Sequence, residues 1–371
     1  MKSNGLFVIS RKEFRDHLMS RKFLMIFGII LIITIIGMAG GAVSYNEEIK
    51  EYNEHQAVAG DKQYSGYYGM FSPTVMTIFS NVGMLIVTLG AILGIAMGFD
   101  LITKEKESKS LKILLSHPIY RDEVINGKAL GGLAALVLAL LITFVISMAL
   151  LLIFGILPNA DEFMYILIFG AAVFLMIFSY FSISLFMSTV ANDSGNALVY
   201  TLIVFILLSG LLPMLVMGPT MDLIIGKPPE YPDNIMMPMM SSSGSTSVSV
   251  SGDSKDASYE SPFESDEWKR YEQEINDYWN KRQGVMDFIN LLSPTNNFQY
   301  ISNYITHPEW YQNKNEIMYS GEGMNFGDMS REKPGLLEIL GDIFKNIIAL
   351  IAIPAVFFGM AYVRFMRLDV R

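Results

Sequence analysis

The stretch ALGGLAALVLALLITFVISMALLLIFGIL, residues 129–157, decides the class of fold because it contains no charged side chain. It is longer than the roughly 20 apolar residues that an α-helix needs to cross the hydrocarbon core of a bilayer. A helix is expected because a segment in lipid must satisfy its own backbone hydrogen bonds, and unbroken apolarity does not fit barrel strands. The stretch therefore predicts a membrane-spanning helix.

Five further apolar runs complete the pattern. The chain is 51% hydrophobic and only 17% charged, whereas a soluble domain carries about 25% charged residues. A soluble helical bundle is disfavoured because the runs lack a polar face. We therefore expect an all-α polytopic membrane protein with six transmembrane helices, at residues 23–43, 75–99, 129–157, 163–190, 197–217 and 347–363.

The orientation follows from Lys and Arg near the ends of the spans. Basic residues gather before the first span, after the second and in the C-terminal tail, whereas the first outer loop has only Lys50 and Lys62 against five acids. Both termini are therefore expected in the cytoplasm. The predicted parts are an interfacial helix (1–22), helices 1–5 (23–217) with a cytoplasmic loop (100–128), an extracytoplasmic domain (218–340) with a disordered Ser/Gly linker (241–256), and helix 6 with a short cytoplasmic tail (341–371).

Two amphipathic helices are expected outside the spans. The N-terminal one has three apolar residues on one side and three basic residues on the other, so it should lie in the membrane interface with the basic face toward lipid phosphates. The alternative is an ordinary basic flank before the first span. The second begins near Ser261–Pro262 and ends at Ser293–Pro294, and its apolar face should pack on outer loops or span ends. The N-terminal faces are Phe7, Phe14 and Leu18 against Arg11, Lys12 and Arg15; the second face is Trp268, Tyr271, Ile275 and Tyr278.

Missing residue types exclude several kinds of chemistry. The spans as bounded above hold no Asp, Glu, Lys, Arg or His, which disfavours an ion-coupled carrier, although backbone carbonyls can bind sodium. Without cysteine there is no disulfide or thiolate site. The Gly-Lys pairs at 127–128 and 226–227 lack the rest of a phosphate-binding loop. We expect no enzyme activity, no bound cofactor or metal and no nucleic-acid partner.

Three glycines recur at four-residue spacing in the second span, at Gly90, Gly94 and Gly98. Small residues at this spacing let two helix backbones approach closely. The sequence leaves open whether the second helix belongs to another copy of the chain, in a dimer, or to the same subunit.

A dense charge block, residues 99–128, separates the second and third spans with six basic and five acidic residues. Its sequence, FDLITKEKESKSLKILLSHPIYRDEVINGK, resembles permease subunits of ABC-2 type transporters, which carry an acidic–basic run, a Thr/Ser-Leu-Lys-x-Leu-Leu-Ser stretch, a proline, a basic residue and a Gly-Lys pair. Where that family often has glycine before Thr-Leu, this chain has Lys109. Residues 9–24 and 290–302 are also similar to the family's N-terminal helix and to the stretch before its last span.

The resemblance implies that this loop is a coupling helix seated on a separate ATP-binding subunit, which would hold ATP and Mg²⁺. Balanced charge suits a protein partner better than anionic lipid, Glu105 and Lys109 are spaced as a helical ion pair, and Pro118 should end the helix. The alternative is a solvated charged loop. The residues expected at the ATPase interface are Lys104, Glu105, Glu107, Leu111, Leu114, Leu115, Ser116, Pro118 and Arg121.

The resemblance further implies a prokaryotic plasma-membrane exporter that pairs with a second permease subunit and contacts membrane lipids. A mechanotransmitter or assembly factor that moves no solute is the alternative, because the outer segment is large. A methionine cluster suggests copper handling as a further function, since thioether sulfur is a suitable ligand for Cu(I). It consists of Met236, Met237, Met239 and Met240. Methionine is, however, also a common filler of apolar cores. The substrate stays open.

Overall fold

The computed structural model describes residues 4–58, 73–110, 120–216, 218–232, 266–307 and 335–368. Within these ranges all regular structure is helical. The described chain contains six helices long and apolar enough to span a membrane, which confirms the predicted fold class. The linker 241–256 and the methionines at 236–240 lie outside the described residues.

Side-chain caps mark two of the span starts: Asn159 accepts from the backbone N–H of Glu162, and Asp193 accepts from that of Asn196. The first is longer than predicted because no glycine or proline follows Gly41 until Gly60, so the acidic segment after residue 43 stays helical. The fifth span contains a π-turn, Leu207–Leu211, directly before a short helix with Pro213, whose missing N–H it accommodates. The spanning helices are α2 (Arg21–Val58), α3 (Met76–Gly98), α6 (Arg121–Ile153), α7 (Ala160–Val190), α8 (Ser194–Ile206) continued by α9 (Leu212–Leu215), and α16 (Leu336–Met366).

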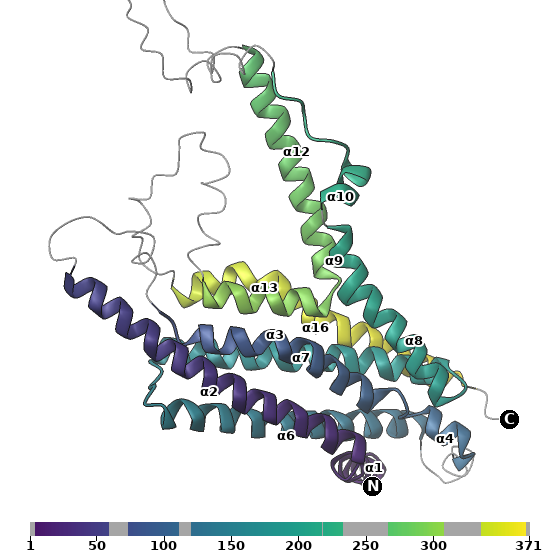
Figure 1. The fold of residues 1–371 in the computed structure, drawn as a ribbon. Coiled ribbons are helices and arrows are strands. Elements are labelled where there is room, and N and C mark those ends of the chain that lie inside the picture. The colour runs from purple at the N-terminus through teal and green to yellow at the C-terminus, as the bar shows by residue number, and fades with distance from the viewer. Residues whose placement is uncertain are drawn as a thin grey trace, which may run out of the picture. The chain divides into compact units, whose positions relative to one another are not determined.

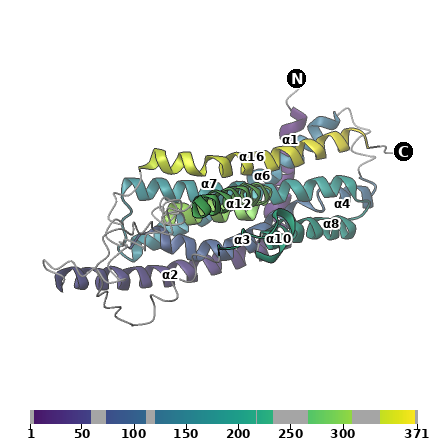
Figure 2. The ribbon, with the colours of Figure 1, turned by 90° about the horizontal axis from the view of Figure 1, so that it is seen from above.

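The chain divides into two units, residues 1–209 with 291–371 and residues 210–290. In the first unit α16, α7, α3 and α2 lie side by side in that order, and α6 packs against α2 and α7 (Figures 1 and 2). The helices α3 and α7 form its centre. In each of them, 61% of the most apolar 18-residue stretch is buried, against 22% in α6 and in α16.

The three spaced glycines explain how α3 and α7 come so close. A Cβ atom on Gly94 would lie 2.5 Å from the carbonyl oxygen of Ile177, and one on Gly98 would lie 2.7 Å from that of Phe181. A Cβ on Gly90 would also touch Ile177, at 3.0 Å. The close contact of these glycines is therefore within one subunit, and their small faces are already occupied.

A short helix, α13 (Pro294–Thr306), is buried between the spans without crossing the membrane. Its Thr295 hydroxyl lies 2.6 Å from that of Tyr180, twenty residues into α7 from Ala160 and so about 30 Å along that helix. Asn297 donates to the carbonyl oxygens of Leu291 and Ser293 and accepts from Asn346 of α16. These bonds satisfy polar groups that lipid could not.

The second unit contains α10 (Gly218–Ile225) and α12 (Asp266–Leu291). The helix α12 ends just before Ser293 and Pro294, as the sequence indicated. Its aromatic face packs on the preceding loop, with the ring of Tyr231 5.8 Å from Trp268 and 5.3 Å from Tyr271.

Candidate functional site

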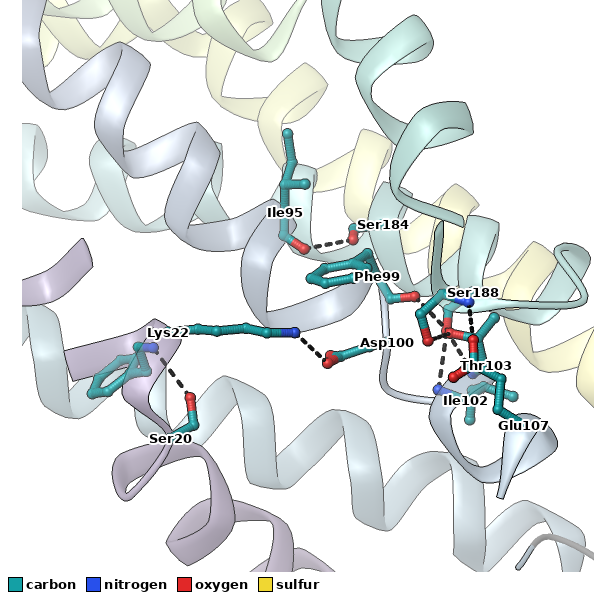
Figure 3. Close-up of polar contacts among 12 residues, drawn as sticks. Ser20, Lys22, Ile95, Phe99, Asp100, Ile102, Thr103, Glu107, Ser184 and Ser188 are labelled. Carbon is teal, nitrogen blue, oxygen red and sulfur yellow. Dashed lines mark hydrogen bonds and ion pairs between the residues drawn. The ribbon is translucent and has the colours of Figure 1, made fainter. Parts of the chain in front are cut away.

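The charge block follows α3 and opens with the short helix α4 (Thr103–Glu107). Its first turn is fixed by Ser188 near the end of α7, whose hydroxyl oxygen accepts from the backbone N–H groups of Ile102 and Thr103 at 3.0 and 3.1 Å (Figure 3). The Thr103 hydroxyl donates to the carbonyl oxygen of Phe99 and lies 3.1 Å from the Ser194 hydroxyl of α8. Because all these groups are buried or half-buried, α4 is held against α7 and α8.

Two charged side chains of α4, Lys106 and Glu107, contact the ends of neighbouring helices. Lys106 donates to the carbonyl oxygens of Thr189 and Ala191, each at 2.8 Å, at the C-terminal end of α7. Glu107 accepts from the backbone N–H of Ser194, the first residue of α8. A cation at a helix C-terminus and an anion at an N-terminus both complement the helix dipole. One short helix thus stabilises the turn between two spans.

A buried ion triad joins α4 to the N-terminal helix. Lys128 of α6 is 3% exposed, and its Nζ lies 2.7 Å from carboxylate oxygens of both Glu13 and Glu105. The second oxygen of Glu105 is buried and makes no hydrogen bond. Removing one member of such a group leaves an unpaired buried charge, which makes the triad a strict positional constraint.

Two further contacts bring in the remaining spans. Lys22, at the start of α2, pairs with Asp100 at 2.8 Å and lies 4.5 Å from the centre of the Phe99 ring (Figure 3). Arg121, at the start of α6, donates to the carbonyl oxygen of Leu368 at 2.8 Å, just beyond α16, and to that of Met366 at 3.3 Å. The charge block and its flanks therefore contact the same end of every span.

The N-terminal helix α1 (Asn4–Leu18) packs along α6 rather than lying free. A Cβ on Gly127 would lie 2.9 Å from Ile9, and one on Gly131 would lie 2.6 Å from Glu13, so glycines at both positions let the helices meet. The predicted faces need correction: Ile9 and Glu13 are buried, whereas Phe7 is 67% exposed. The physical reason is the attraction of Glu13 to Lys128.

Burial and charge shift two pKa values on α1. Burial alone would raise the pKa of Glu13, but the attraction and hydrogen bond of Lys128 outweigh it, so the pKa lies below its usual value. Burial lowers the pKa of His17, although Glu13 and Asp100 oppose this. The shift favours the neutral form of His17, whose buried Nε2 makes no hydrogen bond.

The structure sorts the residues expected at the ATPase interface into three groups. The charged groups of Glu105, Glu107 and Arg121 contact other residues of this chain. These three residues therefore hold the loop in position. Lys104 is exposed on α4. Leu111, Leu114, Leu115, Ser116 and Pro118 lie outside the described residues, and their contact with a partner stays a prediction.

The predicted pair of Glu105 with Lys109 is not formed. The helix α4 ends at Glu107, Glu105 pairs with Lys128, and Lys109 adopts the left-handed backbone conformation with φ of +57°. This is the position at which the resembling permeases often have glycine, the residue that adopts such angles without strain.

Sequence reasoning missed the roles of Glu13, Lys106 and Lys128. Lys128 was placed one residue outside a span whose predicted start was Ala129. Glu13 carried a usable signal, because it stands four residues after Ile9 on the face of α1 that is buried. A lone acid on an apolar face indicates a buried cation, but its partner cannot be identified from spacing.

A family model described as ABC-2 family transporter protein matches residues 7–370, nearly the whole chain. No curated protein matches it. The match includes the charge block, the six spans and the buried helix α13, and it agrees with the resemblance seen in residues 99–128. The chain belongs to the ABC-2 family of transporter proteins.

Proposed function

We propose that the chain is the permease subunit of an ATP-driven exporter, powered by ATP hydrolysis on a separate ATP-binding subunit. Members of the family generally work with such a subunit. The observation that carries the proposal is the contact of the charge block with the same end of all six spans. A displacement of the loop at residues 110–120 would be transmitted to α7 and α8 through Lys106 and Glu107. It would be transmitted to α16 through Arg121.

This arrangement suggests separate roles for the two subunits. Leu111, Leu114 and Leu115 would enter a groove on the ATPase, while α4 converts their movement into displacement of the spans. ATP and Mg²⁺ would be held by the partner, because this sequence has no phosphate-binding loop. A second permease would complete the transporter in the plasma membrane.

The test co-expresses the chain with a candidate ATP-binding subunit. The purified permease alone should hydrolyse no ATP, and the co-expressed complex should do so. Leu115→Asp should weaken binding of the ATPase, whereas Leu157→Asp, an equally drastic change at an exposed position in the link after α6, should leave it bound. ATP hydrolysis by the permease alone, or undiminished binding by the Leu115 variant, would refute the proposal.

A mechanotransmitter is the second candidate, favoured by the separate unit at residues 210–290. The long helix α12 exposes Trp279 and Phe288 there, which could contact an outer partner. Release of such a partner from vesicles on ATP addition, with no solute moved, would favour this function over export.

A further inference from the structure

The ring of His17, near the end of α1, lies where α1 meets α6 and α7. A Cβ atom on Gly132 of α6 would lie 3.5 Å from Nε2 of His17 and 2.7 Å from the ring of Phe181 on α7. Among the described residues, Nε2 is buried and has no hydrogen-bond partner. Its nearest surroundings are therefore a glycine and an aromatic ring, neither of which accepts a proton-bearing nitrogen.

The neutral imidazole suits these surroundings, and the imidazolium ion does not. Both ring nitrogens of a protonated histidine carry a hydrogen that needs an acceptor. A buried donor without an acceptor costs free energy, and a buried charge costs more. Burial accordingly lowers the pKa of His17. A proton on this ring is therefore accommodated better when the ring faces water.

The charged groups around His17 already have partners. Three acids and one base act on its ring, namely Glu13, Asp16, Asp100 and Lys128. Glu13 pairs with Lys128 at 2.7 Å, and Asp100 pairs with Lys22 of α2 at 2.8 Å. Helix α7 adds no charge here, because residues 163–190 hold none. A proton on His17 would therefore compete with Lys128 for Glu13 and with Lys22 for Asp100.

His17 belongs to the face of α1 that contacts α6. It follows Glu13 by four residues and Glu13 follows Ile9 by four, so the three side chains share one side of the helix. Ile9 lies against Gly127, Glu13 pairs with Lys128, and His17 lies against Gly132. A charge at the third of these contacts acts directly on the packing of α1 against α6.

We propose that His17 is an acid-sensitive switch: when its ring takes up a proton, α1 leaves the start of α6 and the ion triad opens. Release places the charged ring in water and separates Glu13 from Lys128. Glu105 of α4 belongs to the same triad, so the charge block loses the support of Glu13 beneath Lys128. The switch needs no ATP-binding partner and therefore stands apart from the proposed function.

The pH range of the switch follows from linkage. His17 has its ordinary pKa of about 6.5 in a released α1 and a lower pKa in the docked helix, so falling pH favours release below about 6.5. Glu13 has a pKa below its ordinary value of about 4.5 and stays ionised above that pH. The range between about pH 6.5 and 5 therefore isolates the proton on His17.

The test measures the distance between α1 and the middle of α6 in the full chain. The sequence has no cysteine, so Val8→Cys with Val145→Cys takes two spin labels, at side chains that are 65% and 63% exposed. In detergent at about pH 7.5 the pair should give one narrow distance distribution, because histidine is then neutral. Below about pH 6.5 a second, broader population should grow by up to about tenfold per pH unit, the dependence for uptake of one proton.

Two variants separate the proton on His17 from a general effect of acid. His17→Gln takes up no proton and should keep the narrow distribution at about pH 5. His17→Lys is charged throughout this range and should show the second population already at about pH 7.5. The parent chain needs no substitution at His17, so its response to pH stands even where a variant fails to fold. An unchanged distribution in the parent chain at about pH 5, or the same acid response in His17→Gln, would overturn the proposal.

Discussion

Lys109 shows how one residue can mark the end of a functional helix. Its φ of +57° lies in the left-handed region, which costs a non-glycine residue about 1–2 kcal/mol. Lys109→Gly should remove this strain and leave the free energy of unfolding unchanged or raised by up to about 1 kcal/mol, since glycine also loses more entropy on folding. Thermal unfolding in detergent measures the change.

Ser108→Gly is the matched control for this position. Ser108 has φ of −77°, so glycine relieves nothing there and should lower stability by about 0.5–1 kcal/mol. If both glycine variants lost the same stability, the strain at Lys109 would be discounted.

The buried triad makes a second prediction at the residue scale. Lys128→Met should lower the free energy of unfolding by about 3–5 kcal/mol, because it leaves Glu13 and Glu105 buried without their cation. Adding Glu13→Gln and Glu105→Gln to the same variant should recover much of the loss. Thermal unfolding of the single and triple variants decides the matter, and a triple variant less stable than the single one would contradict this account.

The lowered pKa of His17 predicts how stability depends on pH. Below its ordinary pKa of about 6.5 the unfolded chain binds a proton on His17 that the folded chain does not, so stability falls as pH is lowered. Glu13 adds to the fall only below about 4.5, where its ordinary carboxyl pKa lies.

The variant that isolates this effect is His17→Gln. The slope of stability against pH between about 6.5 and 5 should become shallower than in the parent chain, because one proton uptake is removed. Equal slopes for the parent and His17→Gln would reject the assignment.

At the scale of helices, the contact of α3 with α7 depends on glycine. Gly94→Ala puts a Cβ 2.5 Å from the Ile177 carbonyl oxygen, so the helices must separate, at a cost of about 1–3 kcal/mol. Gly40→Ala on α2 meets nothing within 4 Å and should be neutral or slightly stabilising. Thermal unfolding of both variants tests this, and equal losses would show that the contact is not tight.

The sequence predicted the helices well and their contacts poorly. Unbroken apolarity locates six spans because lipid permits little else. It cannot locate α13, whose polar residues Thr295 and Asn297 are buried against Tyr180 and Asn346. A short polar helix before the last span has the pattern of a surface segment, and only the tertiary hydrogen bonds show that it lies among the spans.

At the scale of the molecule, the sequence singled out the charge block but did not predict the contacts that it makes within the chain. Eleven charges between two apolar spans indicated a site, whereas the partners of Glu105, Glu107 and Arg121 come from residues up to 247 positions away. Such pairings depend on the fold and leave no local spacing to recognise. The inward charges fix the block against the ends of the spans, and the proposed function makes it the connector between the loop and the spans.

The most direct test of this connector asks whether ATP on the partner moves the far ends of the spans. Spin labels at Leu157→Cys and Leu337→Cys report the distance between the link after α6 and the start of α16, where both side chains are exposed. In the complex with the ATP-binding protein, ATP and Mg²⁺ should change this distance. Lys106→Met with Arg121→Met should abolish the change while ATP hydrolysis continues, and Lys50→Met, at an exposed position of α2, should preserve it. An unaltered ATP-driven change in the double variant would contradict the account.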